Sequence, residues 1–99
     1  MPDRERLDIT IRGGVQGVGF RYFTLRTASS LDLEGWVANA PDGSVHCVAE
    51  GPRAALDRLL AALSSGPPGA RVDRVEQAWS PATGGLGAFG VRSGSHRGD

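Results

Sequence analysis

Lysine is absent from this 99-residue chain, cysteine occurs once, and long apolar runs are missing. Without lysine the chain has neither a Schiff-base residue nor the cation of a P-loop. The single cysteine excludes an intrachain disulfide and a thiolate metal cluster. No segment approaches the roughly 20 apolar residues of a membrane helix, and the charged start, residues 1–6, lacks the apolar core of a signal peptide. The sequence therefore predicts a cytoplasmic protein that does not bind membranes.

Positive and negative charges cancel over the whole chain but are unevenly distributed along the sequence. Eleven basic residues, all arginine, offset eleven acidic ones, so the formal net charge is zero. This balance gives no overall field that would attract nucleic acid or an anionic membrane. Positions 12–31, however, contain Arg12, Arg21 and Arg26 and neither Asp nor Glu. The local excess of positive charge favours an anionic ligand in this part of the chain.

Apolar periodicity predicts one domain with the element order β-α-β-β-α-β and a short final strand. The predicted elements are a strand at 7–12, a helix at 20–31, strands at 33–39 and 45–49 joined by a tight turn, a helix whose apolar stripe is Leu56, Leu59, Leu60 and Leu63, a strand at about 72–79, and a strand around 89–91. This order is typical of a ferredoxin-like α+β fold, in which two helices cover one face of an antiparallel sheet. The domain spans residues 1–99, with a core at about 5–92 and a flexible polar tail at 93–99.

Two details of the predicted strands concern packing. Cys47 alternates with Val45 and Ala49, so we expect it in the core. The apolar spacing of the strand from Val72 to Trp79 is imperfect, which predicts a β-bulge or an edge position there.

The stretch from Ile11 to Arg21, IRGGVQGVGFR, joins the first predicted strand to the first predicted helix. Its glycines allow backbone amides to turn toward a ligand, and a helix N-terminus adds unpaired N–H groups and a positive dipole end. The run does not match G-x-G-x-x-G, because Tyr22 stands where the third glycine would be, and it lacks the G-K-[ST] of a P-loop. Spacing alone fits a phosphate site and a structural glycine-rich turn equally well.

Arg21 is the first candidate for a functional side chain. A cation in the first turn of a helix opposes the helix dipole, and a residue that breaks a local rule without structural gain is a candidate for function. A phosphate between the guanidinium and the amides would remove the conflict, and the planar fork of arginine can hold two phosphate oxygens at once. The alternative is an Arg21 that is simply solvated.

Asn39 is the second candidate, at the end of a predicted strand and just before Pro41-Asp42-Gly43. Its amide carries one acceptor and one donor group, so it can hold a water molecule at one end and a phosphoryl oxygen at the other. The alternative is an asparagine that only initiates the turn.

The two histidines and two tryptophans carry weaker signals. His46 and His96 are far apart and lack the spacing of metal ligands, so we expect no metal site. Trp36 and Trp79 fit either a core or a rim position.

Two motifs at the right separation resemble the acylphosphatase family: residues 11–21, and residues 35–51, GWVANAPDGSVHCVAEG. The second predicted helix and residues 66–75, GPPGARVDRV, also resemble this family, so the likeness covers nearly the whole chain. The chain departs from the family pattern at Gly14, Asp32 and Ala38, which bear on substrate affinity and loop rigidity.

The resemblance implies a hydrolase without metal or cofactor that cleaves small acyl phosphates to a carboxylate and inorganic phosphate. By the same resemblance, Arg21 binds the substrate phosphate and Asn39 orients the attacking water. The residues implied to hold the phosphate, mainly through their backbone, are Val15, Gln16, Gly17, Val18, Gly19 and Phe20, together with Arg21.

Two other function classes remain as alternatives: a phosphate-binding regulator without turnover, and an RNA-binding ferredoxin-like module. RNA-binding modules of this fold stack bases on exposed sheet aromatics. Here aromatic residues make up 6% of the chain and form no such pattern. We therefore expect no nucleic-acid partner, and the fold is compatible with a monomer.

Overall fold

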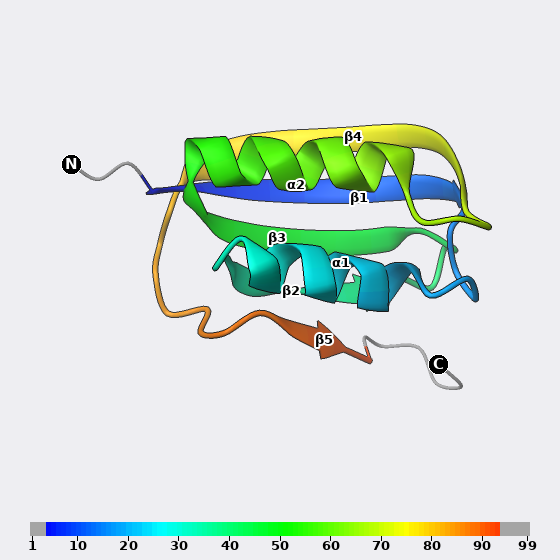
Figure 1. The fold of residues 1–99 in the computed structure, drawn as a ribbon, viewed down its shortest axis with the longest axis horizontal. Coiled ribbons are helices and arrows are strands. Elements are labelled where there is room, and N and C mark those ends of the chain that lie inside the picture. Colours follow the sequence, from blue (N-terminus) through cyan, green and yellow to red (C-terminus); the bar gives the residue numbers. More distant parts are fainter. Residues whose placement is uncertain (1–3, 94–99) are drawn as a thin grey trace.

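The computed structural model describes residues 4–93, which form two helices and a five-stranded sheet (Figure 1). The elements in chain order are β1 (Arg4–Gly14), α1 (Phe20–Ser30), β2 (Glu34–Asn39), β3 (Val45–Pro52), α2 (Arg53–Ser65), β4 (Arg71–Pro81) and β5 (Gly90–Arg92). The predicted order of elements is confirmed. Of the predicted tail, residues 94–99, with His96 among them, lie outside the described part.

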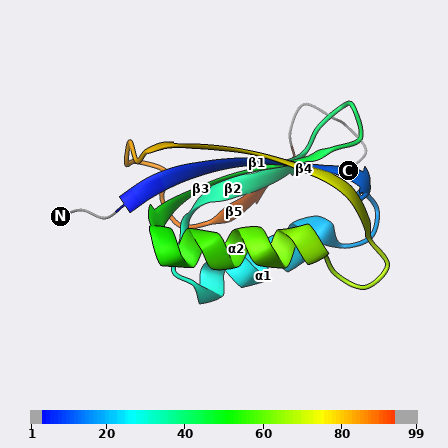
Figure 2. The same cartoon turned by 90° about the horizontal axis from the view of Figure 1, so that it is seen from above.

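The sheet has the strand order β4-β1-β3-β2-β5, and both helices pack against the same face of it (Figure 2). The pairs β1–β3, β1–β4 and β2–β3 are antiparallel, as a ferredoxin-like fold requires. One feature differs from the prediction of a wholly antiparallel sheet. The short β5 pairs with β2 in parallel, because the connector that follows β4 crosses to the opposite edge of the sheet before the chain turns back along β2 (Figure 1).

The core lies between the sheet and the helices. Leu7, Ile9 and Ile11 of β1 are fully buried and alternate with polar residues on the opposite face. Phe20, Thr24 and Ala28 of α1 and Leu56, Leu59 and Leu63 of α2 complete this core from the helical layer. Cys47 is buried among them, as predicted, and burial raises the pKa of its thiol.

The irregular β4 is both an edge strand and bulged, so both explanations of its apolar spacing hold. Its register with β1 runs from Leu7 opposite Trp79 to Arg12 opposite Arg74, and then shifts, so that Gly13 lies opposite Val72. Asp73 is therefore the extra residue on β4, and the side-chain period of 2 is broken there.

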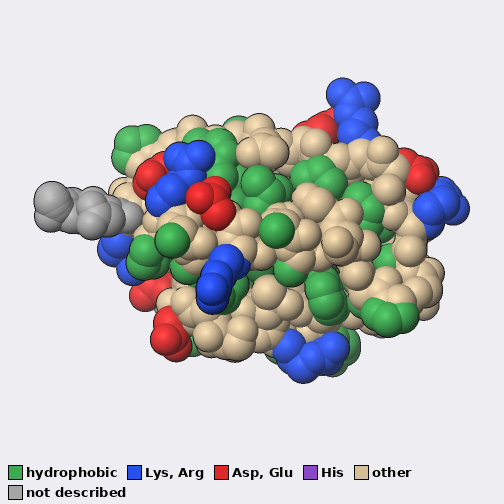
Figure 3. Space-filling view, turned by 45° about the horizontal axis from the view of Figure 1, so that its top comes forward, with side chains coloured by type: hydrophobic (Ala, Val, Ile, Leu, Met, Phe, Trp, Pro, Cys, Tyr) green, Lys and Arg blue, Asp and Glu red, His purple; other side chains and the backbone are tan. Residues whose placement is uncertain are grey.

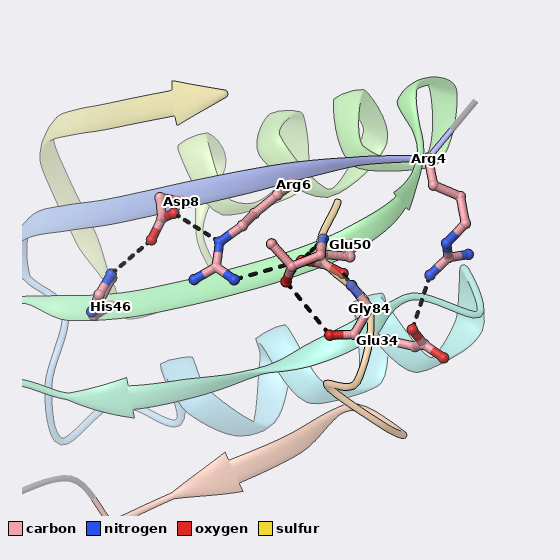
Figure 4. A network of polar contacts seen from close by, with 8 residues as sticks. Arg4, Arg6, Asp8, Glu34, His46, Glu50 and Gly84 are labelled. Atoms are coloured by element: carbon pink, nitrogen blue, oxygen red, sulfur yellow. Dashed lines mark hydrogen bonds and ion pairs between the residues drawn. The ribbon is translucent and has the colours of Figure 1, made fainter. Parts of the chain in front are cut away.

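The face of the sheet away from the helices carries a chain of polar contacts (Figure 4). Arg6 lies between Asp8 and Glu50, with N–O distances of 3.3 and 3.5 Å. Glu50 is 0% exposed and also accepts hydrogen bonds from Thr83 and from the backbone N–H of Gly84, at 3.0 and 2.9 Å. Burial alone would raise the pKa of Glu50, but these hydrogen bonds and Arg6 together lower it. The carboxylate thus fixes the connector between β4 and β5 to the centre of the sheet.

No helix among residues 4–93 has the length and apolarity to span a membrane. On the face drawn in Figure 3, arginine and acidic side chains are interspersed with apolar ones and do not gather into a region of one sign.

Candidate active site

The loop between β1 and α1 is held at both ends by buried apolar side chains. Val15 is 1% exposed and Phe20 is 2% exposed, whereas Gly17 and Gly19 between them are exposed. Burying an apolar side chain of this kind contributes about 1.5–3 kcal/mol each. The loop therefore has fixed ends and presents its glycine backbone to solvent.

Gly17 and Gly19 have backbone φ angles of 77° and 79°. Added Cβ atoms would meet nothing within 4 Å at either position, so crowding does not explain the choice of glycine. The left-handed conformation does, because other residues adopt it only at a cost of about 1–2 kcal/mol. These two residues turn the chain so that it enters α1.

Gly19 is also the N-cap of α1, and α1 begins without the usual stabilising groups. No side chain caps its N-terminus, and its first turn contains no acidic residue. The first N–H groups of a helix have no acceptor within the helix, and the dipole places partial positive charge there. Arg21 in the same turn adds a full positive charge. The start of α1 thus carries positive charge from both the helix dipole and Arg21.

Asn39 is the last residue of β2 and is 7% exposed. It alternates along β2 with Gly35 and Val37, so its side chain is on the face that carries the helices. α1 packs on β2. A polar amide at this position is therefore enclosed between the sheet and the first turn of the helix.

Arg21 and Asn39 line one pocket of about 180 Å³. The full lining consists of Val15, Gly17, Gly19, Phe20, Arg21, Tyr22 and Asn39. The two side chains predicted to act together are therefore brought together by the fold. Gln16 and Val18 of the predicted phosphate loop are not part of the lining.

Sequence reasoning missed Tyr22 as a residue of this pocket. Its side chain is 62% exposed, the larger fraction of the two exposed large hydrophobic residues in the described chain. The signal was present, because Tyr22 lies off the apolar stripe of α1 and directly follows Arg21. An aromatic residue outside the buried face of a helix is a candidate for contact with a ligand.

Gln16 contacts the turn that follows Asn39. Its amide nitrogen donates hydrogen bonds to the carbonyl oxygens of Ala40 and Ser44, both at 2.9 Å. The loop before α1 and the turn after β2 are thus connected through one side chain.

The turn after Asn39 is ordered by Asp42. One carboxylate oxygen accepts hydrogen bonds from the backbone N–H and the hydroxyl of Ser44, at 3.0 and 2.6 Å, and the other lies 2.9 Å from Arg12. The Ser44 hydrogen bonds, and then Arg12, hold the pKa of Asp42 well below its usual range. The carboxylate of Asp42 thus joins the turn to Arg12 of β1.

A second pocket of about 270 Å³ lies at the other end of α1 and includes Asp32 and Glu34. Two carboxylates would repel a phosphate, so this pocket does not suit the predicted ligand. Asp32 has a φ of 57°, the left-handed conformation that glycine adopts most readily and that aspartate tolerates. This geometry accounts for the departure from the family pattern at Asp32.

The remaining predicted residues lie elsewhere. The ring of His46 is on the open face of the sheet, 3.4 Å from Asp8 and edge-on to Trp36. Within residues 4–93, His, Cys, Asp and Glu side chains do not gather in groups of three or more that could hold a metal ion. Trp79 faces the helical layer, where the guanidinium of Arg53 lies 3.7 Å from the centre of its ring.

A family model and curated relatives match most of the chain. Residues 7–91 match the family model described as Acylphosphatase. The chain is 50% identical over 88 residues to an acylphosphatase of Salinibacter ruber, covering 89% of this chain and 93% of the relative. It is 47% identical over 92 residues to an acylphosphatase of Anaeromyxobacter dehalogenans, covering 93% and 99%.

A solved structure is similar over most of the chain. The crystal structure of acylphosphatase from Bacillus subtilis superposes with a TM-score of 0.86 at 38% sequence identity, covering 89% of this chain and 98% of that one. The family match at residues 7–91 includes both motifs.

Proposed function

The chain belongs to the acylphosphatase family, hydrolases that act on acid anhydrides, and we propose that Arg21 and Asn39 carry the hydrolysis of small acyl phosphates here without a metal ion. The observation that supports this assignment is that both side chains line one pocket at the electropositive start of α1. The catalytic function is favoured over a phosphate-binding regulator and over an RNA-binding module by the same family membership.

Arg21 is proposed to hold the phosphoryl group. Its guanidinium can bind two of the three non-bridging oxygens, while backbone N–H groups of the loop and of the first turn of α1 bind the third. Phosphoryl transfer places much of its charge on these equatorial oxygens, so fixed donors around them lower the barrier. The unfavourable position of Arg21 at a helix N-terminus is then offset by the bound anion.

Asn39 is proposed to hold the attacking water in line with the bond that breaks. The water oxygen bonds to phosphorus, the bond from phosphorus to the acyl oxygen breaks, and the carboxylate leaves with its electron pair. A carboxylate needs no proton to leave at neutral pH, because the pKa of a carboxylic acid is about 4. The proton of the water passes to phosphate or solvent. Positioning rather than a strong base then accounts for the rate.

The composition of the pocket agrees with this mechanism. Its lining among the described residues contains an arginine, an asparagine, a tyrosine and apolar residues, but no carboxylate, imidazole or thiol. These are the groups that hold catalytic metal ions or act as general bases. The positive charge of Arg21 and the backbone amides take the part that a metal ion would otherwise have.

We further propose a cytoplasmic monomer without a nucleic-acid partner. Two arginines on the open sheet face are matched with acids, Arg6 with Asp8 and Arg12 with Glu76. Trp36 on that face is covered by the guanidinium of Arg92, 4.4 Å from the ring centre. A sheet that binds RNA would instead offer uncovered aromatics and unmatched positive charge.

The experiment that tests the function is hydrolysis of acetyl phosphate, followed by the loss of the substrate, with inorganic phosphate as inhibitor. We expect turnover and competitive inhibition by phosphate. A protein that binds phosphate but does not turn over acetyl phosphate would instead be a phosphate-binding regulator.

A further inference from the structure

The side chain of Gln16 connects the two halves of the proposed site. Its amide nitrogen has two N–H groups, and it donates to two carbonyl oxygens, those of Ala40 and Ser44, at 2.9 Å each. Both donors of the amide are thereby engaged. The side chain of Gln16 is consequently committed to the turn after β2 and does not donate to a phosphate.

The two carbonyls that Gln16 contacts are those that close this turn. The backbone N–H of Ala40 donates to the Ser44 carbonyl at 2.9 Å, and the N–H of Gly43 donates to the Ala40 carbonyl at 3.1 Å. Each carbonyl oxygen thus accepts one bond from within the turn and one from Gln16. Asn39 directly precedes Ala40, so the amide of Gln16 fixes the chain one residue away from the proposed water-binding side chain.

A second side-chain contact joins the turn to β1 and is weaker than the Gln16 hydrogen bonds. Arg12 and Asp42 lie 2.9 Å apart, but their side chains are 42% and 54% exposed. Exposed ion pairs of this kind contribute little, about 0–1 kcal/mol, and salt screens them. Gln16 is therefore the part-buried side-chain contact that joins the turn directly to the loop before α1.

We propose that Gln16 is a positioning residue for the hydrolysis, which acts by holding Asn39 in register with the phosphate bound at the loop and Arg21. This inference rests on the proposed function. It assigns to the Gln16 side chain a role different from that of the loop backbone. The loop has its own anchors in buried Val15 and Phe20, so removal of the amide affects the turn and Asn39 more than the phosphate cradle.

The test is a comparison of Gln16→Leu with Gln16→Met, since both keep most of the side-chain volume and neither can donate a hydrogen bond. We expect kcat for acetyl phosphate to fall about tenfold to a hundredfold, as small displacements of a reacting group do. The inhibition constant of inorganic phosphate should change by less than about threefold, because the cradle and Arg21 remain. Gln77→Leu is the matched control, because Gln77 is an exposed glutamine on β4, and its kcat should equal that of the wild type.

A double-mutant cycle with Asn39→Ala then separates positioning from general destabilisation. If Gln16 acts through Asn39, adding Gln16→Leu to Asn39→Ala should lower the residual kcat by less than about twofold. Circular dichroism establishes whether each variant is folded at the assay temperature. If Gln16→Leu is not folded, Gln16→Met takes its place in the cycle.

Three results would overturn the proposal: a wild-type kcat in both Gln16 variants, an equal loss of kcat and of phosphate affinity, or a full further loss of kcat in the double variant. Failure of the proposed function is distinct from all three. It would appear as no turnover of acetyl phosphate by the wild-type protein, or as wild-type turnover in Asn39→Ala itself.

Discussion

Arg21 of α1 and Asn39 of β2 line the same pocket of about 180 Å³, one from the first turn of a helix and the other from a buried strand end. The mechanism divides the reaction between them, with Arg21 on the phosphoryl group and Asn39 on the water. This division makes the two residues separable by kinetics. Loss of Arg21 should weaken phosphate binding and turnover together, whereas loss of Asn39 should affect turnover alone.

Arg21→Ala is expected to lower kcat/KM for acetyl phosphate by at least about 10²–10³-fold, the usual effect of removing one preorganised group that stabilises transition-state charge. Inhibition by inorganic phosphate should weaken in parallel. Arg26→Ala removes the same charge from an exposed position on the same helix, outside the pocket lining, and is the control. Equal losses in the two variants would mean that net charge, rather than the fork of Arg21, accounts for the effect.

Gly19→Ala is expected to weaken phosphate inhibition by about tenfold and to lower the free energy of unfolding by about 1–2 kcal/mol, because alanine is strained at a φ of 79°. The control is Gly69→Ala, at a φ of 91° and also with nothing within 4 Å of an added Cβ. It should show a similar loss of stability but bind phosphate normally. Titration with phosphate and urea denaturation measure the two effects. Unchanged phosphate inhibition in Gly19→Ala would argue against the loop as the cradle.

Glu50→Gln is expected to lower the free energy of unfolding by about 1–3 kcal/mol at pH 7, the usual cost of losing charged hydrogen bonds in a buried site. The pKa of Glu50 is lower in the folded protein than in the unfolded chain, so its contribution is complete above the unfolded value of about 4.3 and is lost as the pH falls through the folded value. The difference in unfolding free energy between wild type and variant should therefore shrink on acidification below pH 4. Urea denaturation at pH 7 and pH 3.5 measures it, and a difference that grows with acidification would contradict the sign of the shift.

Hydrolysis of acetyl phosphate is expected to proceed at an unchanged rate after dialysis against EDTA. The charge that stabilises the phosphoryl group belongs to Arg21 and to backbone amides, which a chelator does not remove. A rate that drops with EDTA and returns with a divalent cation would show that a metal ion takes part.

Much of the fold could be predicted from local patterns because each pattern has a local cause. The alternation of Leu7, Ile9 and Ile11 follows from a strand with one buried face, and Pro41-Asp42-Gly43 follows from turn geometry. The irregular apolar spacing of β4 is also visible in the sequence itself, and the bulge at Asp73 explains it. Such features depend on neighbours in the sequence, so they can be read without the tertiary structure.

Features that depend on distant partners could not be predicted in this way. The parallel pairing of β5 with β2 is decided by the path of the connector from β4, whose glycines allow many directions. Glu50 looks like the polar end of a strand, and its burial becomes evident only when Thr83 and Gly84 fold over it. In the site, Arg21 and Asn39 could be proposed from their chemistry, but the contact of Gln16 with Ala40 joins segments that only the folded sheet brings together.

The most direct test of the central claim is the comparison of kcat for acetyl phosphate with the inhibition constant of inorganic phosphate in Asn39→Ala. Since Asn39 is assigned to the water and Arg21 to the phosphoryl group, we expect kcat to fall by about 10²–10³-fold while phosphate inhibits within about threefold of its wild-type constant. A variant that retains wild-type turnover would contradict the assignment of Asn39 to the attacking water.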